Sequence, residues 1–421
     1  MVNGNAAGAL LAAWNQAEDA QKLGVLDAYL STKAKTGYAL GNIRPENVAG
    51  LYGKRLQLSA SQVDQHSLCR MAYFLKYGLR AKERKEATVD PAEFGTYVHA
   101  VLEATARDVM AAGGFHKVDL ETTLSIAKKH SDDYTQAHFS QLSSGRMEYL
   151  FRRNMEELEM VVQELWRELN ESEYAPQAFE LHFAADGDMP PISVQGKTMS
   201  AALRGFVDRV DLWRRGESSY YRVVDYKTGK KDFDYCDVLN GVGLQMLLYL
   251  FALEDEGEKI LGATRVGAGI QYFPARAPFV STDGSLTQEE AQQLRRKEWK
   301  RPGLLLEDTD SIAAMDPSPD LQLLRCGKDK NGNLTGDIAS KQQLGKLKQY
   351  VMTLLENMVD SISAGDTKAN PYTRGTSFNA CTFCPYGDIC HKECVQDRRN
   401  YKAVKAPQFW EQIEKEVADH G

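Results

Sequence analysis

The chain has 421 residues, of which 43% are hydrophobic and 26% are charged, as expected for a water-soluble globular protein with two or three domains or one elaborated domain. The formal net charge is -7, so no overall positive field indicates nucleic-acid binding, although a local basic groove would be enough. No long apolar run predicts a membrane helix, and the short apolar segment 8–14 lacks the flanks of a signal peptide. We therefore expect a cytoplasmic protein without membrane contact.

The first part of the chain, residues 1–58, is predicted to be helical and then irregular, like a linker or the tail of a preceding region. A helix is expected from the N-cap candidate Ser59 through Cys69 to about Leu79. A second helix is expected over residues 91–112. Residues 118–170 are predicted to be helical because apolar residues recur there with a period of 3.6, which gives a helical insert at about 110–175.

The pattern changes to strands after residue 178. Strands are expected over 179–184, 203–213, 220–226 and 269–273, with a helix over 238–253 before the last of them. This order predicts an α/β fold with a mixed central sheet flanked by helices. Residues 275–340 are polar and are expected to form a long insert with little core. A helix over 344–362, a Cys-rich loop over 371–394 and a tail at 396–421 with a short helix near 409–417 complete the chain, so the main domain is expected at 59–395.

The most informative motif is Asp225-Tyr226-Lys227, which follows Gly205-Phe206-Val207-Asp208. Residues two apart in a strand share a face, so Asp225 and Lys227 project together. Carboxylates can hold a hard cation such as Mg²⁺, and a neighbouring lysine can orient a water or offset charge on a phosphate. A single D-x-K motif is more often an ordinary solvated strand edge, so it needs support from other residues.

Further residues of suitable chemistry stand in the helices on either side. His99, in the expected helix 91–112, has a side chain that binds divalent metals well. Glu103 lies one turn later and is either a partner of His99 or a plain ion-pair residue. Gln245 and Tyr249 lie one turn apart after the D-x-K strand, where they could contact a phosphate or only cap the core. Arg209 is expected to hold the fold by pairing with a carboxylate.

Two basic stretches are notable, because a local groove could bind a polyanion. One spans residues 70–86 and has six cations against two acidic residues. The other comprises residues 295–297 with Lys300 and Arg301. Each is also typical of a solvated helix face. The phosphate-binding pattern G-x-x-x-x-G-K-[ST] is absent, since Pro191 stands where Gly196-Lys197-Thr198 would need the first glycine.

Three closely spaced thiols, Cys381, Cys384 and Cys390, form a C-x2-C-x5-C pattern that predicts a metal or cluster site in a reducing compartment. The fourth ligand could be the local Cys394 or the distant Cys69, 312 residues upstream of Cys381. The spacing favours Cys394 and is compatible with zinc as well as iron. Cys236 and Cys326 are expected to be free thiols.

The order G-x-x-x-H, G-x-x-D, D-x-K and Q-x-x-x-Y resembles the RecB-type branch of the PD-(D/E)XK nuclease superfamily over residues 59–395. The region around Cys69 and the three later cysteines resembles the C-terminal nuclease domains of AddB-type subunits of AddAB helicase–nucleases. The resemblance implies a Mg²⁺ (or Mn²⁺) site formed by His99, Asp208, Asp225 and the carbonyl of Tyr226. It also implies a catalytic set of Lys227, Asp225, Asp208, Gln245 and Tyr249.

The same resemblance implies a structural 4Fe-4S cluster on Cys69, Cys381, Cys384 and Cys390. It further implies a bacterial deoxyribonuclease, an exonuclease that works with a helicase–nuclease subunit of the AddA type. Its substrate would be a single DNA strand from an unwound duplex end, in double-strand-break processing and recombinational repair. The alternatives are a stand-alone iron–sulfur nuclease of the CRISPR-adaptation type, which would leave the two inserts unexplained, and an inactive DNA-end-binding module, which would be expected to lack an acidic ligand or the lysine.

Overall fold

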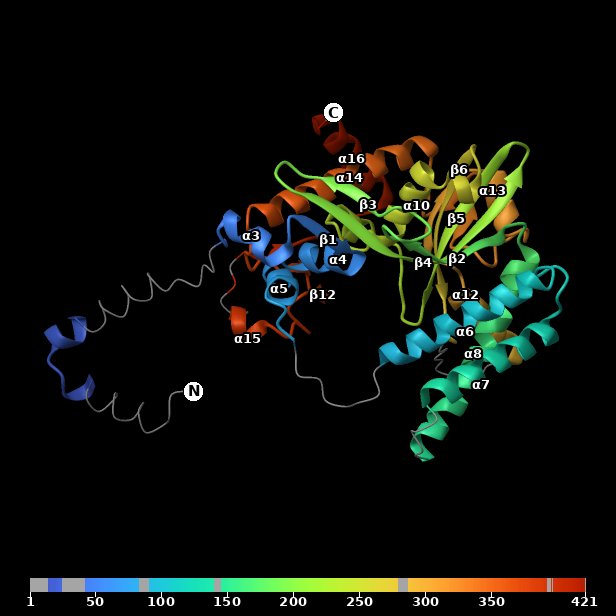
Figure 1. Cartoon of the computed structure of the whole chain (residues 1–421), viewed down its shortest axis with the longest axis horizontal. Helices are drawn as coiled ribbons and strands as arrows, with labels where there is room; N and C mark the ends of the chain where they lie inside the picture. Colours follow the sequence, from blue (N-terminus) through green and yellow to red (C-terminus); the bar gives the residue numbers. More distant parts are fainter. Residues whose placement is uncertain are drawn as a thin grey trace.

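The computed structural model describes residues 14–24, 42–82, 91–139, 145–278, 287–391, 395 and 397–420. Its centre is a mixed eight-stranded sheet with helices on both faces, which confirms the expected α/β class (Figure 1). The strands of this sheet are β1 (Arg55–Ser59), β2 (Ala175–Phe183), β3 (Ile192–Gln195), β4 (Ser200–Arg215), β5 (Ser218–Lys227), β6 (Arg265–Pro274), β7 (Gly303–Leu306) and β10 (Ile338–Ala339).

The long strand β4 organises this sheet, since four other strands pair with it. Its first part pairs with β1 in parallel and with β3 in antiparallel orientation. Its second part lies between β2 and β5, both antiparallel to it. From β5 the sheet continues through β6 and β7 to β10. Because β1 belongs to the sheet, pairing begins upstream of the boundary expected at residue 59.

One face of the sheet is covered by α6 (Pro91–Ala111), α7 (Leu120–Phe139) and α8 (Gly145–Glu171), which lie together at the lower right of Figure 1. Leu102 and Leu165 from these helices are fully buried in a cluster with Val224 and Tyr226 of β5. The apolar period predicted for residues 147–169 is therefore confirmed for the buried positions of α8, which face this cluster.

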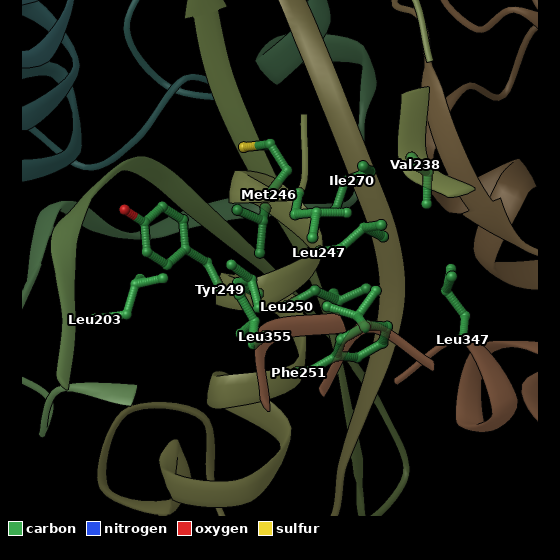
Figure 2. Close-up of a cluster of buried hydrophobic side chains, with 14 of the residues drawn as sticks. Leu203, Val238, Met246, Leu247, Tyr249, Leu250, Phe251, Ile270, Leu347 and Leu355 are labelled. Carbon is green, nitrogen blue, oxygen red and sulfur yellow. The ribbon is translucent and has the colours of Figure 1, made fainter. Parts of the chain in front are cut away.

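The opposite face carries α10 (Gln245–Glu256), α14 (Lys341–Ser363) and α16 (Ala406–His420). Figure 2 shows how Leu247 and Leu250 of α10 meet Ile270 of β6 and Leu355 of α14. Each of these side chains is at most 2% exposed. The tight packing places α10, with the motif residues Gln245 and Tyr249, firmly against the centre of the sheet.

The remaining elements connect these layers or lie at the margins of the sheet. They are α3 (Pro45–Tyr52), α4 (Ala60–Leu68), α5 (Arg70–Tyr73), a π-helical turn (Phe74–Gly78), α9 (Tyr235–Leu239), α11 (Glu258–Leu261), α12 (Gln288–Glu298), α13 (Thr309–Met315), β8 (Cys326–Lys328), β9 (Leu334–Gly336), β11 (Tyr372–Arg374), β12 (Phe378–Asn379), α15 (Gly387–Cys390) and β13 (Arg399–Asn400). Within the described part of the chain, no helix is both long and apolar enough to cross a bilayer.

The single helix expected from Ser59 to Leu79 is wrong in one respect. Ser59 does form a capping box with Gln62, so the start is as predicted. The helix stops at Leu68, because Cys69 adopts an extended conformation with φ -168° and ψ 120°. A new helical segment, α5, then starts at Arg70, so Cys69 occupies the junction between two helical segments.

The expectation of little core in residues 275–340 is also wrong. All four residues of β7 are buried, and this strand pairs with β6 inside the sheet. Leu305 packs in a cluster with Ile312 and Met315 of α13. The segment is mostly polar and its strands are short, but its apolar side chains in β7 and α13 occupy buried positions.

A cluster of charged side chains is buried beneath α8. Glu168 accepts hydrogen bonds from Arg209 at 2.6 Å, Arg222 at 2.9 Å and Arg301 at 2.8 Å. Asp211 completes it through contacts of 2.8 Å with the Nε atoms of Arg209 and Arg222. The predicted pairing of Arg209 with a carboxylate is thereby confirmed. The cluster ties α8, β4, β5 and the segment before β7 together.

Replacing Glu168 with Gln should destabilise the protein. The substitution would leave three buried guanidinium groups with one carboxylate less, and breaking a buried ion pair costs about 3–5 kcal/mol. Urea unfolding at neutral pH measures the change. Glu159→Gln is a matched control on the exposed face of α8 and should change the unfolding free energy by less than about 0.5 kcal/mol. Equal effects of the two substitutions on the free energy of unfolding would contradict the proposed contribution of the cluster to stability.

Candidate active site

Three carboxylates lie in a row across neighbouring strands. The register of β2 with β4 places Glu180 opposite Asp208, since Phe179 pairs with Arg209 and Leu181 with Val207. On the other side of β4, the pair Arg209–Val224 is followed by Asp208 opposite Asp225. Like charges directly opposite in a sheet are destabilising. The row therefore favours protons or a cation between these groups.

His99 reaches this row from α6. Its Nδ1 atom lies 3.4 Å from Oδ2 of Asp208. Burial alone lowers the pKa of His99, but the hydrogen bond and charge of Asp208, with the charge of Asp225, raise it above the ordinary value. His99 is held in this place by α6, whose buried residues pack in one cluster with Val224 and Tyr226 of β5. The structure thus brings His99 and Asp208 together.

Tyr226 contributes its backbone rather than its side chain. Its N–H donates a 2.7 Å hydrogen bond to Oδ2 of Asp208, and its carbonyl is a hydrogen-bond partner of the His99 ring. The phenol points to the other face of the sheet, where its oxygen lies 3.4 Å from Arg209. The backbone of Tyr226 is thus next to both residues, and its carbonyl as a metal ligand stays a prediction.

Asp225 and Lys227 project from the same face of β5, as the strand period predicts. The Nζ atom of Lys227 lies 2.5 Å from Oδ2 of Asp225, which is only 4% exposed as a residue. Burial raises the pKa of Asp225 to about 6, an effect that Asp208 increases and Lys227 opposes. The lysine thus has a neighbouring carboxylate as counter-ion and remains half-exposed toward solvent.

Glu180 was not among the candidates from the sequence. It adopts φ 47°, an uncommon left-handed conformation for a residue with a side chain, in the middle of β2. Burial, together with Asp208 and Glu103, raises the pKa of Glu180 to about 7. In the sequence Glu180 is one polar residue in a strand of alternating polar and apolar residues, so the alternation does not distinguish it as a functional residue. The pairing of β2 with β4 alone reveals it.

The structure groups His99, Glu180 and Asp208 as possible metal ligands, with ligand atoms within 4.8 Å of one another. They line a cavity of about 540 Å³ together with Glu103. Imidazole nitrogen and carboxylate oxygen suit a divalent cation, so these residues fit the implied Mg²⁺ or Mn²⁺. Asp225 stands beside this group and not within it, since its carboxylate contacts Lys227. Glu103 pairs with Arg107 at 2.8 Å, as a plain ion-pair residue would.

Gln245 and Tyr249 hold one another on α10. Their side chains are hydrogen-bonded, and burial raises the pKa of Tyr249 to about 12, so the phenol keeps its proton. Tyr249 also bonds to the backbone of Phe206 in β4. A Cβ atom on Gly205 would lie 1.9 Å from the phenol oxygen, which explains the glycine before Asp208. These contacts support a positioning role for the pair, and a catalytic role for either residue stays a prediction.

Four cysteines meet at the other end of the molecule. Cys69, at the junction of α4 and α5, lines one hollow with Cys381, Cys384 and Cys390. Burial, together with the other three thiols, raises the pKa of Cys390 to about 11. Four sulfur ligands around one hollow suit an iron–sulfur cluster or a tetrahedral zinc ion.

The other cysteines differ in position. Cys394, the alternative fourth ligand, lies outside the described residues. Cys236 and Cys326 are buried elsewhere, and the Cys236 sulfur lies 3.4 Å from the phenol oxygen of Tyr372. No disulfide joins any of the six cysteines in the described ranges. The geometry thus brings together the set of four that includes Cys69.

Comparison with known proteins agrees with this geometry. Residues 57–391 match the family model of the PD-(D/E)XK nuclease superfamily. An ATP-dependent helicase/deoxyribonuclease subunit from Moorella thermoacetica is 34% identical over 83% of this chain and 31% of its own length. Proteins with the same name from Clostridium tetani and Thermoanaerobacter sp. are 31% and 30% identical over 85% and 88% of this chain.

The chain spans about a third of the length of these relatives, 32% and 33% for the second and third. The match to the family model covers the acidic row and all four cysteines around the hollow. With His99, Asp208, Asp225 and Lys227 in place around one row of strands, this chain belongs to the PD-(D/E)XK nuclease superfamily.

Proposed function

We propose that this chain is a divalent-cation-dependent deoxyribonuclease that cleaves phosphodiester bonds at the acidic row of β2, β4 and β5. The observation that carries the proposal is the approach of His99 to Asp208, with Asp225 and its partner Lys227 on the next strand. An ordinary strand edge would not gather an imidazole, three carboxylates and an ammonium group from three strands and a helix. The arrangement suits hydrolysis of an anionic ester.

His99, Asp208 and Asp225 would hold Mg²⁺ or Mn²⁺, with the Tyr226 carbonyl as a further ligand. Such a cation, when bound, polarises a phosphoryl oxygen and lowers the pKa of a bound water. Glu180 stands at the same cavity, opposite Asp208, and is available as one more oxygen ligand. Because the carboxylates of Asp208, Asp225 and Glu180 repel one another when they are ionised, a cation bound between them is favoured.

Lys227 would orient the attacking water and stabilise the charge that develops on the phosphate. Its ammonium group is already held by Asp225, so little side-chain freedom is lost when the substrate binds. Fixed groups of this kind are typically worth about 3–4 kcal/mol each in transition-state stabilisation. Gln245 and Tyr249 would support β4, since their contacts reach the backbone next to Asp208.

For the cysteines we propose a 4Fe-4S cluster on Cys69, Cys381, Cys384 and Cys390. The support is their placement around one hollow, with partly apolar walls formed by Met71, Ala72 and Tyr386. The cluster would close a very long loop of chain, which lowers the entropy of the unfolded state as a disulfide does. Its role would be structural, because the acidic row is built from other elements.

We further propose that the nuclease works in a cytoplasmic AddAB-type complex for double-strand-break processing and repair. The relatives are named as subunits of an ATP-dependent helicase/deoxyribonuclease, and this chain lacks a G-x-x-x-x-G-K-[ST] motif for a nucleotide. An AddA-type helicase subunit would therefore unwind the duplex end and supply a single strand to the acidic row.

Substituting either residue of the D-x-K motif should remove cleavage. Asp225→Asn removes a metal-binding charge, and Lys227→Ala removes the group that stabilises developing charge. Each should lower the rate at least about 10²-fold. The measurement is Mg²⁺-dependent cleavage of end-labelled single- and double-stranded DNA, with thermal unfolding to show that the variants fold. Asp186→Asn, on an exposed turn, is the control. Near-normal cleavage by a folded Asp225 or Lys227 variant would refute the assignment.

Glu180→Gln should stabilise the cation-free protein at pH 8. The pKa of Glu180 is raised to about 7, so the folded protein is penalised once the group ionises, and its stability falls as the pH rises from about 4.5 to 7. In EDTA the variant's Tm should exceed that of the wild type at pH 8, and the difference should be smaller at pH 5. Added Mg²⁺ should raise the wild-type Tm more. Equal responses of both proteins to pH and Mg²⁺ would exclude Glu180 from the site.

Anaerobically purified protein should be coloured and contain about four iron atoms per chain, as the proposed cluster requires. Cys69→Ser and Cys384→Ser should lose iron, because each would remove one of four ligands. Cys394→Ser and Cys326→Ser should keep it. Metal analysis with visible absorbance makes the comparison. A colourless protein with one zinc ion would refute the cluster, and iron loss in Cys394→Ser alone would reassign the fourth ligand.

A further inference from the structure

A second cavity adjoins the D-x-K motif, and Lys227 is one of the residues that line it. Its volume is about 600 Å³. Two acidic residues, Glu157 and Glu298, are among the residues that line it. The cations around it outnumber them and come from four separate segments of the chain: Lys227, Lys230, Lys231, Arg276, Lys300 and Arg325.

The cations of this cavity differ in how they are paired. Arg276 lies 3.6 Å from Glu157, and Arg325 pairs with Asp232. Lys230 and Lys300 form no ion pair with any residue in the described ranges, whereas Lys227, Arg276 and Arg325 are paired. Uncompensated cations that converge on a cavity attract an anion, because they repel one another without it.

The second basic stretch of the sequence is divided by the structure. Arg301 is 2% exposed and belongs to the buried cluster around Glu168. Lys300, the preceding residue, is turned to the cavity beside β5 and β6. One of the two neighbouring cations therefore serves the fold, and the other remains available for a ligand.

We propose that this cavity binds the phosphate backbone of the DNA strand next to the bond that is cleaved. The inference rests on the proposed nuclease function and adds a substrate-binding subsite to it. Lys227 belongs to both places, since it lines the cavity and touches Asp225. A DNA strand with one phosphate at the acidic row would therefore extend directly into the basic cavity.

The size of the cavity favours a single strand. Volumes of about 300–1,000 Å³ are typical of sites for small ligands, which leaves room for one or two nucleotides and not for a duplex.

The experiment compares the binding of fluorescein-labelled oligodeoxythymidylate of about twenty nucleotides, a length beyond the roughly 4–16 that a single-strand site covers, in EDTA, where no cleavage interferes. Lys230→Ala/Lys300→Ala removes two of the cavity's cations that form no ion pair within the described ranges. Each lost phosphate contact lowers the salt dependence of binding to a single strand by about 0.7 in logarithmic slope. The double variant should therefore have a slope smaller by about 1.4 and bind about 25-fold more weakly at about 0.1 M salt.

Two variants serve as controls, and thermal unfolding shows that all of them fold. Lys128→Ala/Lys129→Ala removes the same charge from an exposed part of α7 and should bind like the wild type. Lys230→Arg/Lys300→Arg keeps the charge in the cavity and should restore the slope. An alanine variant at Lys230 and Lys300 that binds like the α7 control overturns the proposal. Weaker binding with an unchanged slope does so too, because lost phosphate contacts must change the slope.

A parallel assay of Mg²⁺-dependent cleavage separates this inference from the proposed function. If the wild type cleaves the oligonucleotide while removal of Lys230 and Lys300 leaves binding unchanged, the subsite is overturned and the nuclease assignment stands. If the wild type neither cleaves nor binds the oligonucleotide, both are overturned. Cleavage by the wild type together with the predicted loss of slope supports both.

Discussion

The register between β4 and β5 is the constraint on which the rest of the site depends. It sets Asp208 opposite Asp225 at a cost, since two carboxylates face one another in a mostly buried place. The same register sets Arg209 and Arg222 around Asp211 and Glu168 on strands that would otherwise be free to shift. A shift by one residue would turn every one of these side chains to the wrong face. The buried ion pairs therefore stabilise the strand register that brings these carboxylates together, although the carboxylates repel one another.

Tyr226 links these two regions through one residue. Its backbone N–H holds Asp208 and its carbonyl meets His99, while its phenol lies beside Arg209 under the sheet. The alternation of strand side chains makes this possible, because residues 225 and 227 face the side of Asp208 when residue 226 faces the core. The central residue of the D-x-K motif is thus a structural contact between the acidic row and the arginine cluster.

The sequence predicts the parts of this molecule that depend on local order. The strand period of Asp225-x-Lys227, the position of His99 in a helix and the pairing of Arg209 could be anticipated, and the structure has them. The features that depend on contacts between distant segments could not be anticipated from the sequence. Glu180 becomes recognisable only through the pairing of β2 with β4, and the break at Cys69 only through the extended conformation between two helices. The buried strand β7 could not be predicted, because its four residues stand among polar ones and are too few to form a recognisable pattern.

The position of Cys69 at the helix junction has a consequence for the order of synthesis. Cys69 leaves the ribosome before the strands from β2 to β10, whereas Cys381, Cys384 and Cys390 follow them. Domains generally fold from the N-terminal side as they are made. The four thiols can therefore meet only after the whole sheet has been produced, and a chain that stops early lacks three of them. Completion of this group would mark a nuclease that is full-length and correctly folded.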